Sequence, residues 1–191
     1  MALKKLKKSL IEAPIIKKKD YFYVVHPITD GVPEINPDLL NEVIDELQKR
    51  IEKIRGIDKI VTIEAMGIPL AATLSLRTKK PFLIIRKREY GLPNEHVVKQ
   101  QTGYSKSKLY INGLKKGDKI VIVDDVLSTG GTLKAIIKNL KSIGVLIQGI
   151  FIVVDKGNNA KKIRETYKID IDILVNIEIV NGKVKIRENI S

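Results

Sequence analysis

The chain has 191 residues, of which 43% are hydrophobic and 30% are charged, and it contains no cysteine. This length predicts a single domain with a core of its own, and the lack of cysteine excludes disulfides, cysteine-bound metals and thiol catalysis. Lys and Arg together number 35 against 22 Asp and Glu, which gives a formal net charge of +13 and raises the question of an anionic partner.

The amino-terminal stretch is rich in lysine. Apolar residues at helical spacing over 3–11 predict a short amphipathic helix that ends before Pro14. Its lysines are most simply a solvated face, and an arm that binds a membrane, RNA or DNA is the alternative. No apolar run reaches the ~18 residues of a membrane span, so we expect a cytoplasmic protein that does not bind membranes.

Strand and helix patterns alternate through the rest of the chain. We expect strands at 21–25, 59–64, 81–86, 119–124, 148–154, 171–176, 177–180 and 184–186, and helices at 39–54, 67–78, 133–140 and 160–167. The runs 119–124 and 148–154 are almost purely apolar, as in parallel strands buried on both faces. The pattern predicts an α/β fold with a mostly parallel central sheet flanked by helices, whose ligands lie beyond the carboxyl ends of the strands.

Two stretches lack these patterns. Residues 26–37 contain three prolines and predict a shaped loop. Residues 87–106 are highly charged and contain Gly91, Pro93 and Gly103, which predicts a long mobile excursion. Loops of this length in a compact domain usually have a function, although a surface loop without a role is the alternative.

The strongest functional signal is the run from Val121 to Thr132, with the sequence Val-Ile-Val-Asp-Asp-Val-Leu-Ser-Thr-Gly-Gly-Thr. It leads from a buried strand through a turn into a helix. Its second half offers three hydroxyls, two glycines that admit close approach, and the free N–H groups of a helix start, all of which suit an anion: Ser128, Thr129, Gly130, Gly131 and Thr132.

Two adjacent carboxylates, Asp124 and Asp125, precede this anion cradle. They would repel a bare phosphate but suit a ribose diol or a bound Mg²⁺ ion. The motif therefore fits a phosphorylated sugar. It lacks the Gly-Lys-Ser/Thr of a P-loop and the spacing of the dinucleotide-binding glycines. A plain turn beside an acidic surface pair is the alternative.

With these residues the chain resembles the type I phosphoribosyltransferases, whose motif for 5-phosphoribosyl 1-pyrophosphate (PRPP) has this form. Four further segments are similar to the archaeal hypoxanthine/guanine phosphoribosyltransferases, so that the resemblance covers nearly the whole chain: 59–68, 86–87, 101–105 and 109–113. It implies the type I fold, with a small base-binding hood built from residues 1–37 and about 157–191, and a homodimer. It also implies purine salvage, in which hypoxanthine or guanine reacts with PRPP to give IMP or GMP and pyrophosphate, with Mg²⁺ as the cofactor.

The resemblance assigns a role to each matching residue. Ser128 to Thr132 would hold the 5′-phosphate, while Asp124 and Asp125 would act in catalysis by meeting the ribose hydroxyls, and Mg²⁺ would arrive with PRPP and touch the protein at most through them. The pyrophosphate would contact Glu64, Ala65, Met66, Gly67, Arg86 and Lys87. The turn from Glu64 to Gly67 often contains a cis peptide in the family, although a plain helix cap explains these residues equally well. A solvated basic loop is the alternative for Arg86 and Lys87.

Lys156 follows the second apolar strand, where enzymes for 6-oxopurines have a lysine that donates to the purine O6. A lysine only donates hydrogen bonds, so it matches the O6 of hypoxanthine or guanine and mismatches the 6-amino group of adenine. An exposed lysine at the start of a loop is the alternative.

Two departures leave the general base unassigned. Ser128 stands where vertebrate-type enzymes have an aspartate, and Gly103 beside Tyr104 stands where adenine enzymes have a glutamate. Adenine or xanthine as the base, or a PRPP-sensing regulator that binds nucleic acid, stay open as alternatives.

The surplus of positive charge is concentrated between Arg77 and Lys119, where twelve basic residues face three acidic ones. This block includes the proposed pyrophosphate contacts and the mobile excursion. A small, highly anionic substrate explains it better than nucleic acid does, so we do not expect nucleic acid as a partner.

Overall fold

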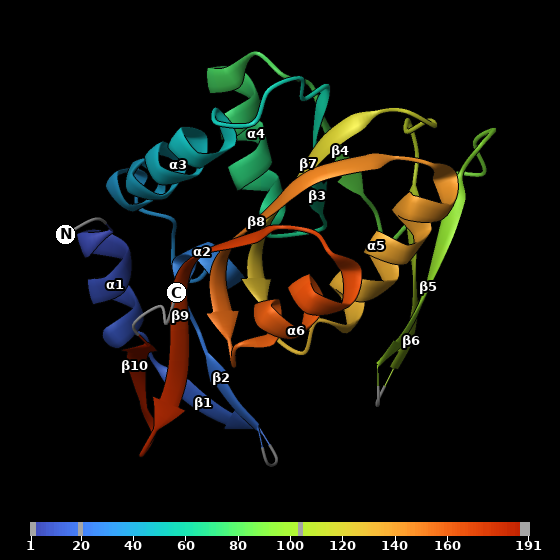
Figure 1. Cartoon of the computed structure of the whole chain (residues 1–191). Coiled ribbons are helices and arrows are strands. Elements are labelled where there is room, and N and C mark those ends of the chain that lie inside the picture. Colours follow the sequence, from blue (N-terminus) through green and yellow to red (C-terminus); the bar gives the residue numbers. More distant parts are fainter. Residues whose placement is uncertain (1–2, 19–20, 103–104, 188–191) are drawn as a thin grey trace.

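A six-stranded sheet runs through the centre of the structure (Figure 1). The computed structural model describes residues 3–18, 21–102 and 105–187. In spatial order the strands are β10 (Lys183–Arg187), β9 (Ile171–Val180), β8 (Leu146–Lys156), β7 (Lys119–Leu127), β3 (Lys59–Ile63) and β4 (Phe82–Ile85). All neighbours pair in parallel except β9 and β10, which form an antiparallel hairpin. The predicted α/β fold with a mostly parallel sheet is confirmed.

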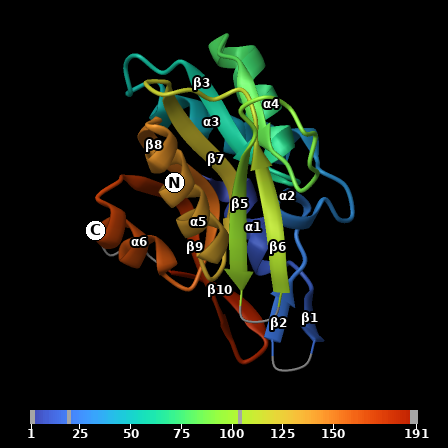
Figure 2. The ribbon, with the colours of Figure 1, turned by 90° about the vertical axis from the view of Figure 1, so that its right-hand side faces the viewer.

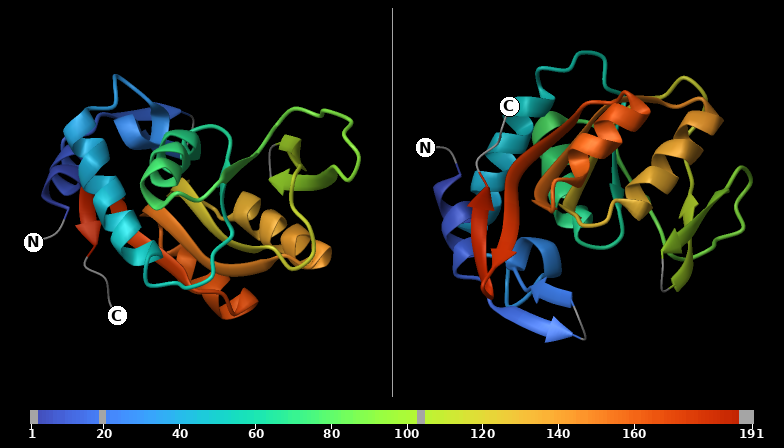
Figure 3. Two further views of the ribbon diagram at one scale, coloured as in Figure 1. Left: turned by 90° about the horizontal axis from the view of Figure 1, so that it is seen from above. Right: turned by 60° about the horizontal axis from the view of Figure 1, so that its bottom comes forward.

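Helices cover both faces of the sheet (Figure 3). α1 (Lys4–Ile11), α3 (Pro37–Ile51) and α4 (Gly67–Thr78) pack on one face, and α5 (Gly131–Ile143) and α6 (Asn159–Tyr167) on the other. Residues of β7 alternate accordingly: Val121 and Val123 join the first core, while Ile120 and Ile122 join the second. Among the described helices, none combines the length and apolar character that crossing a bilayer requires.

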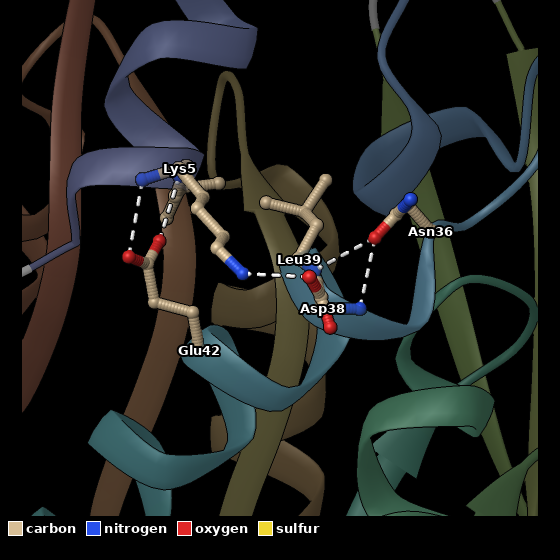
Figure 4. A network of polar contacts seen from close by, with 6 residues as sticks. Lys5, Asn36, Asp38, Leu39 and Glu42 are labelled. Atoms are coloured by element: carbon tan, nitrogen blue, oxygen red, sulfur yellow. Dashed lines mark hydrogen bonds and ion pairs between the residues drawn. The ribbon is translucent and has the colours of Figure 1, made fainter.

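The amino-terminal helix α1 is held against α3 by polar contacts (Figure 4). The Glu42 carboxylate accepts hydrogen bonds from the backbone N–H groups of Lys5, at 3.0 Å, and Leu6, at 2.8 Å. Lys5 also pairs with Asp38 at 2.9 Å. Because first-turn N–H groups lack partners within their own helix, Glu42 acts as a cap supplied by a distant segment.

The predicted helix at 39–54 begins two residues earlier than expected. The Oδ1 atom of Asn36 accepts from the N–H groups of Asp38, at 2.8 Å, and Leu39, at 3.3 Å (Figure 4). Asn36 is thus the cap, and Pro37 takes the first helical position, where its missing N–H costs nothing.

The segment before α3 contains one predicted strand and two elements that the sequence pattern does not reveal. The strand expected at 21–25 is β2 (Tyr21–Val24). It pairs with the unpredicted β1 (Ile15–Lys18), and the one-turn helix α2 (Pro27–Asp30) lies inside the predicted loop 26–37. A single turn is too short to display a helical period. Together with α1 and the β9–β10 hairpin, these elements form one side of the molecule (Figure 1).

The irregular excursion expected over 87–106 is wrong for its second half. β5 (His96–Thr102) and β6 (Ser105–Ile111) form an antiparallel pair beside α5 (Figure 2). Val98, Leu109 and Ile111 are buried in the core on this side. Among the residues of β5 whose burial is described, only Val98 belongs to this core, so the apolar alternation is too weak to predict a strand. The mobility of 87–106 stays a prediction, and Gly103 and Tyr104 lie outside the described residues.

Candidate active site

The residues with expected roles meet at one edge of the sheet. β3, β4, β7 and β8 are parallel, so their carboxyl ends point the same way. Residues 64–67 follow β3, Arg86 and Lys87 follow β4, residues 128–132 follow β7, and Lys156 is the last residue of β8. This is the edge at which open α/β sheets bind their ligands.

Asp124 and Asp125 lie near the end of β7, which continues to Leu127 instead of ending at Asp124 as expected. The longer strand arises because β8 pairs with it up to Leu127. Loss of solvation raises the pKa of Asp124 well above its usual value, and the adjacent Asp125 adds to this effect. Burial also raises the pKa of Asp125 to about 6, while the charge of Lys156 acts in the opposite direction. A ligand that brings positive charge or hydrogen-bond donors favours the ionised pair.

The loop after β7 forms a small pocket at the start of α5. Its volume is about 220 Å³, and it is lined by Asp124, Ile152 and residues 126–133. Gly130 has a φ of 77° and is the residue before the helix. A side chain there would approach Ile163 to 2.7 Å, so the sharp turn needs glycine on both counts. The pocket has the size and the helix N-terminus that suit a phosphate group.

α6 braces this loop from the side. The Asn159 side chain donates to the Ser128 carbonyl. Asp155 is fully buried and accepts from the N–H of Ala160 at 3.1 Å and that of Asn159 at 3.4 Å. Burial raises the pKa of Asp155 although these hydrogen bonds oppose the shift. The sequence does not predict this supporting role, because its one signal is a carboxylate four residues before a helix start.

The turn after β3 joins the two segments expected to contact pyrophosphate. The peptide between Glu64 and Ala65 is cis, as the family resemblance implied. Glu64 Oε2 accepts from the backbone N–H of Lys87 and from Arg86 Nε, both at 3.0 Å. These contacts hold the pKa of Glu64 below its usual value, the N–H of Lys87 having the largest effect. Glu64 therefore ties the end of β3 to the end of β4.

The amino-terminal segment reaches the same edge. An ideal Cβ on Gly31 would lie 3.3 Å from Met66 Cε, so the end of α2 contacts the turn after β3. The charge of Asp30 raises the pKa of Asp125, and Lys156 lowers it, so these three charged groups act on one another. The structure thus brings α2 and Lys156 to the acidic pair.

His26 is the cap of α2 and was not among the expected residues. Its Nδ1 accepts from the N–H of Ile28 at 3.2 Å, so the proton of the neutral ring is on Nε2, which contacts Ser9 Oγ at 2.9 Å. Ser9 Oγ in turn donates to the Leu6 carbonyl at 3.0 Å. This series of hydrogen bonds connects α1 to the segment beside the candidate active site. Burial lowers the pKa of His26 to about 4, Asp30 opposing the shift.

We expect His26→Ala to lower the free energy of unfolding by about 1–2 kcal/mol through loss of the cap, and His26→Asn, which keeps an acceptor, to cost less. Unfolded histidine binds a proton near pH 6.5 and folded His26 only near pH 4, so its contribution to stability is lost as pH falls through this window. Denaturant unfolding curves at several pH values give the difference in the free energy of unfolding between wild type and variant. A difference that does not change between these pH values contradicts the assignment.

A larger groove of about 950 Å³ lies away from these residues, between α6, the end of α3 and the early parts of β8 and β9. Its arginines already have partners. Arg50 donates to the Ile173 carbonyl and pairs with Asp172, and Arg164 donates to the Ile171 carbonyl. These carbonyls lie on the side of β9 away from β8, so the arginines cap an open strand edge. The groove therefore has no expected role in the reaction.

The chain is similar to known proteins over most of its length. A family model described as phosphoribosyl transferase domain matches residues 34–183. The chain is similar to the hypoxanthine/guanine phosphoribosyltransferase of Aciduliprofundum boonei, with 50% identity over 96% of this chain and 99% of the relative. It is 52% identical to the protein of the same name from Ferroglobus placidus, over 98% of this chain and 99% of the relative.

Solved structures show the same fold. An adenine phosphoribosyltransferase from Thermoanaerobacter pseudethanolicus superposes with a TM-score of 0.73 at 26% identity, covering 92% of this chain and 99% of that one. The adenine phosphoribosyltransferase of Saccharomyces cerevisiae superposes with a TM-score of 0.75 at 21% identity, covering 90% and 97%. At this low identity the second match shows the fold alone.

Proposed function

The chain belongs to the phosphoribosyl transferase domain family, and from that premise we propose that it salvages purines, converting hypoxanthine or guanine and PRPP to IMP or GMP and pyrophosphate. The relatives at about half identity over nearly the whole chain carry the name of this activity. The structural observation that supports it best is the acidic pair beside the phosphate-sized pocket, at the edge shared by Lys156 and the turn after β3.

In the proposed reaction a ring nitrogen of the purine attacks C1′ of PRPP as the bond from C1′ to pyrophosphate breaks, and positive charge develops on the sugar. The imidazole proton of the purine is released to solvent. The 5′-phosphate lies in the loop Ser128–Thr132, and the ribose hydroxyls donate to Asp124 and Asp125. Pyrophosphate lies between the turn 64–67 and the outer edge of the Arg86 guanidinium, whose Nε is already used by Glu64. These contacts orient the reacting groups and stabilise the departing charge, and no covalent enzyme intermediate is needed.

Mg²⁺ fits this site as an ion brought by the substrate. Within the described residues no cluster of three or more metal-binding side chains occurs. Asp124 and Asp125 supply carboxylate oxygens, which Mg²⁺ prefers, and PRPP and water would complete its coordination. When bound, the ion neutralises charge on the pyrophosphate. We propose that it touches the protein at most through this pair.

Lys156 is proposed to select the base. The residue is half-buried at the end of β8, and its charge is close enough to Asp125 to lower the pKa of that carboxyl. We expect Lys156→Met to lower kcat/KM for hypoxanthine by about 100-fold, because the purine O6 loses its donor, and to leave KM for PRPP unchanged. Lys162→Met, at an exposed position of α6, is the matched control and should match the wild type. An unchanged kcat/KM in Lys156→Met would show that another group binds O6.

Steady-state assays with each of hypoxanthine, guanine, adenine and xanthine, with PRPP and Mg²⁺, test the proposed function. We expect turnover of the 6-oxopurines hypoxanthine and guanine. Preferential turnover of adenine or xanthine would reassign the base within the same chemistry. Binding of PRPP without turnover of any purine would favour the regulator.

We also propose a cytoplasmic homodimer that does not bind nucleic acid, as expected from the family and from the commonness of two-fold symmetric assemblies. Light scattering on the purified chain measures the assembly. Binding of duplex DNA and of RNA is measured at increasing salt, once with the full chain and once after deletion of 1–19. The comparison shows whether the lysine-rich arm binds nucleic acid.

A further inference from the structure

The side-chain hydroxyl of Thr62, on β3, is buried, and neither the fold nor the proposed reaction described above gives it a function. The residue is fully buried, and within the described part of the chain its Oγ1 has no hydrogen-bond partner. Its neighbours along the strand are apolar, and valine would fill the same volume without burying a hydroxyl. A buried hydroxyl without a partner is destabilising, so such a group calls for an explanation.

The space in front of this hydroxyl is shared with Asp124. An ideal Cβ on Gly67 would lie 2.0 Å from Thr62 Oγ1 and 2.8 Å from Asp124 Oδ1. The two oxygens therefore pack against the same side of residue 67, which admits them because it has no side chain. Among the described residues, no other side-chain oxygen lies as close to this point.

We propose that Thr62 is a positioning residue for Asp124: when PRPP is bound, its hydroxyl donates to Asp124 Oδ1 and keeps the carboxylate aimed at the ribose. The proposal rests on the proposed function of Asp124. In the structure, the carboxyl group of Asp124 interacts with that of the adjacent Asp125. Ribose hydroxyls that engage the pair would compete with this contact, and Thr62 then offers Asp124 a replacement donor from the protein side.

The test compares two substitutions at residue 62. Thr62→Val keeps the shape and removes the donor, whereas Thr62→Ser keeps the donor. We expect Thr62→Val to lower kcat about tenfold and to weaken Mg–PRPP binding in calorimetry, with an unchanged KM for hypoxanthine and a melting temperature equal to or above that of wild type. Thr62→Ser should retain wild-type kcat and Mg–PRPP affinity. Thr73→Val, which removes a hydroxyl bonded to the Pro69 carbonyl within α4, is the control and should also retain kcat.

The outcomes separate a positioning role from a packing role. Wild-type kcat and Mg–PRPP affinity in Thr62→Val overturn the proposal, and so does a Thr62→Ser variant as impaired as Thr62→Val, since the methyl group would then be what matters. If Thr62→Val does not fold, Thr62→Ser alone decides, because a serine with much reduced kcat contradicts the proposal and one with wild-type kcat supports the need for the hydroxyl. Failure of wild type to turn over any purine would overturn the proposed function. The Mg–PRPP affinities of wild type, Thr62→Val and Thr62→Ser would still test the positioning role of Thr62. Failure of wild type to bind Mg–PRPP would overturn both.

Discussion

Replacing Asp124 and Asp125 together by asparagine is expected to lower kcat by about 1,000-fold or more while the protein stays folded. Asparagine has the size of aspartate but no negative charge, so the pair would no longer stabilise positive charge on the sugar or bind the ion that arrives with PRPP. Steady-state kinetics with hypoxanthine, PRPP and Mg²⁺ measure the effect. A double variant with the wild-type rate would refute the assignment of the site.

The same variant is expected to melt at a higher temperature than wild type at neutral pH. Burial raises the pKa of both carboxyls, that of Asp125 from 3.8 to about 6, so the folded state binds protons more tightly than the unfolded state. Stability contributed by the pair is therefore present at low pH and is lost as pH rises through this window. The asparagine pair has no such loss, and thermal melts from acidic to neutral pH should show the difference from wild type shrinking as pH falls.

Asp118 provides a control for which we expect the opposite change in stability at neutral pH. It is buried at the other end of β7, where the ion pair with Lys59 and the N–H of Lys115 lower its pKa although burial alone would raise it. Asp118→Asn should therefore lower stability at neutral pH and leave kcat unchanged. If Asp118→Asn and the double asparagine variant at residues 124 and 125 changed stability equally, this explanation of the acidic pair would be contradicted.

The sequence predicts the parts of the site that lie on continuous motifs. The run from Val121 to Thr132 contains the carboxylates, the hydroxyls and the glycines of one turn, and the helix expected at 67–78 has the bounds of α4. Contacts between distant segments could not be predicted in this way. Glu64 meets Arg86, and Glu42 meets the start of α1, through pairings that depend on the packed fold.

The net charge of a segment indicates less well which basic residues face an anionic ligand than the contact partners of each basic side chain do. Arg77 belongs to the basic block between Arg77 and Lys119, yet it pairs with Asp45 of α3 and also donates to Asn41 at 2.7 Å. It therefore joins two helices and does not face the proposed substrate. Arg86 and Lys87, by contrast, lie beside the turn after β3. We therefore expect the proposed anionic substrate to account for part of the block, whereas contacts within the fold account for another part.

Gly67→Ala is expected to lower kcat by about 100-fold or more, although alanine favours helices and residue 67 begins one. Gly67 does not have a positive φ, so alanine would be tolerated if there were room. The added Cβ would lie 2.0 Å from Thr62 Oγ1, 2.8 Å from Asp124 Oδ1 and 3.2 Å from the Val123 carbonyl. The start of α4 would have to move away from β7, displacing the turn 64–67 and disturbing Asp124.

The stability cost of Gly67→Ala should be about 1–3 kcal/mol, as for other overpacked sites. Gly182→Ala is the control, because Gly182 has a φ of 71° in the β9–β10 turn and its Cβ would meet nothing within 4 Å. It should cost stability through backbone strain alone and leave kcat unchanged.

A double-mutant cycle with Thr62→Ala separates the two consequences of crowding at Gly67. Removing the Thr62 hydroxyl opens the tightest contact, so Gly67→Ala should cost less stability in the Thr62→Ala background than in wild type. The contacts with Asp124 and the Val123 carbonyl persist, and the hydroxyl proposed to position Asp124 is also lost, so kcat should stay low in the double variant. Additive stability effects would mean that Thr62 does not limit the space at residue 67. Recovery of kcat together with stability would mean that the loss in Gly67→Ala came from this clash alone and that Asp124 does not need the space above Gly67.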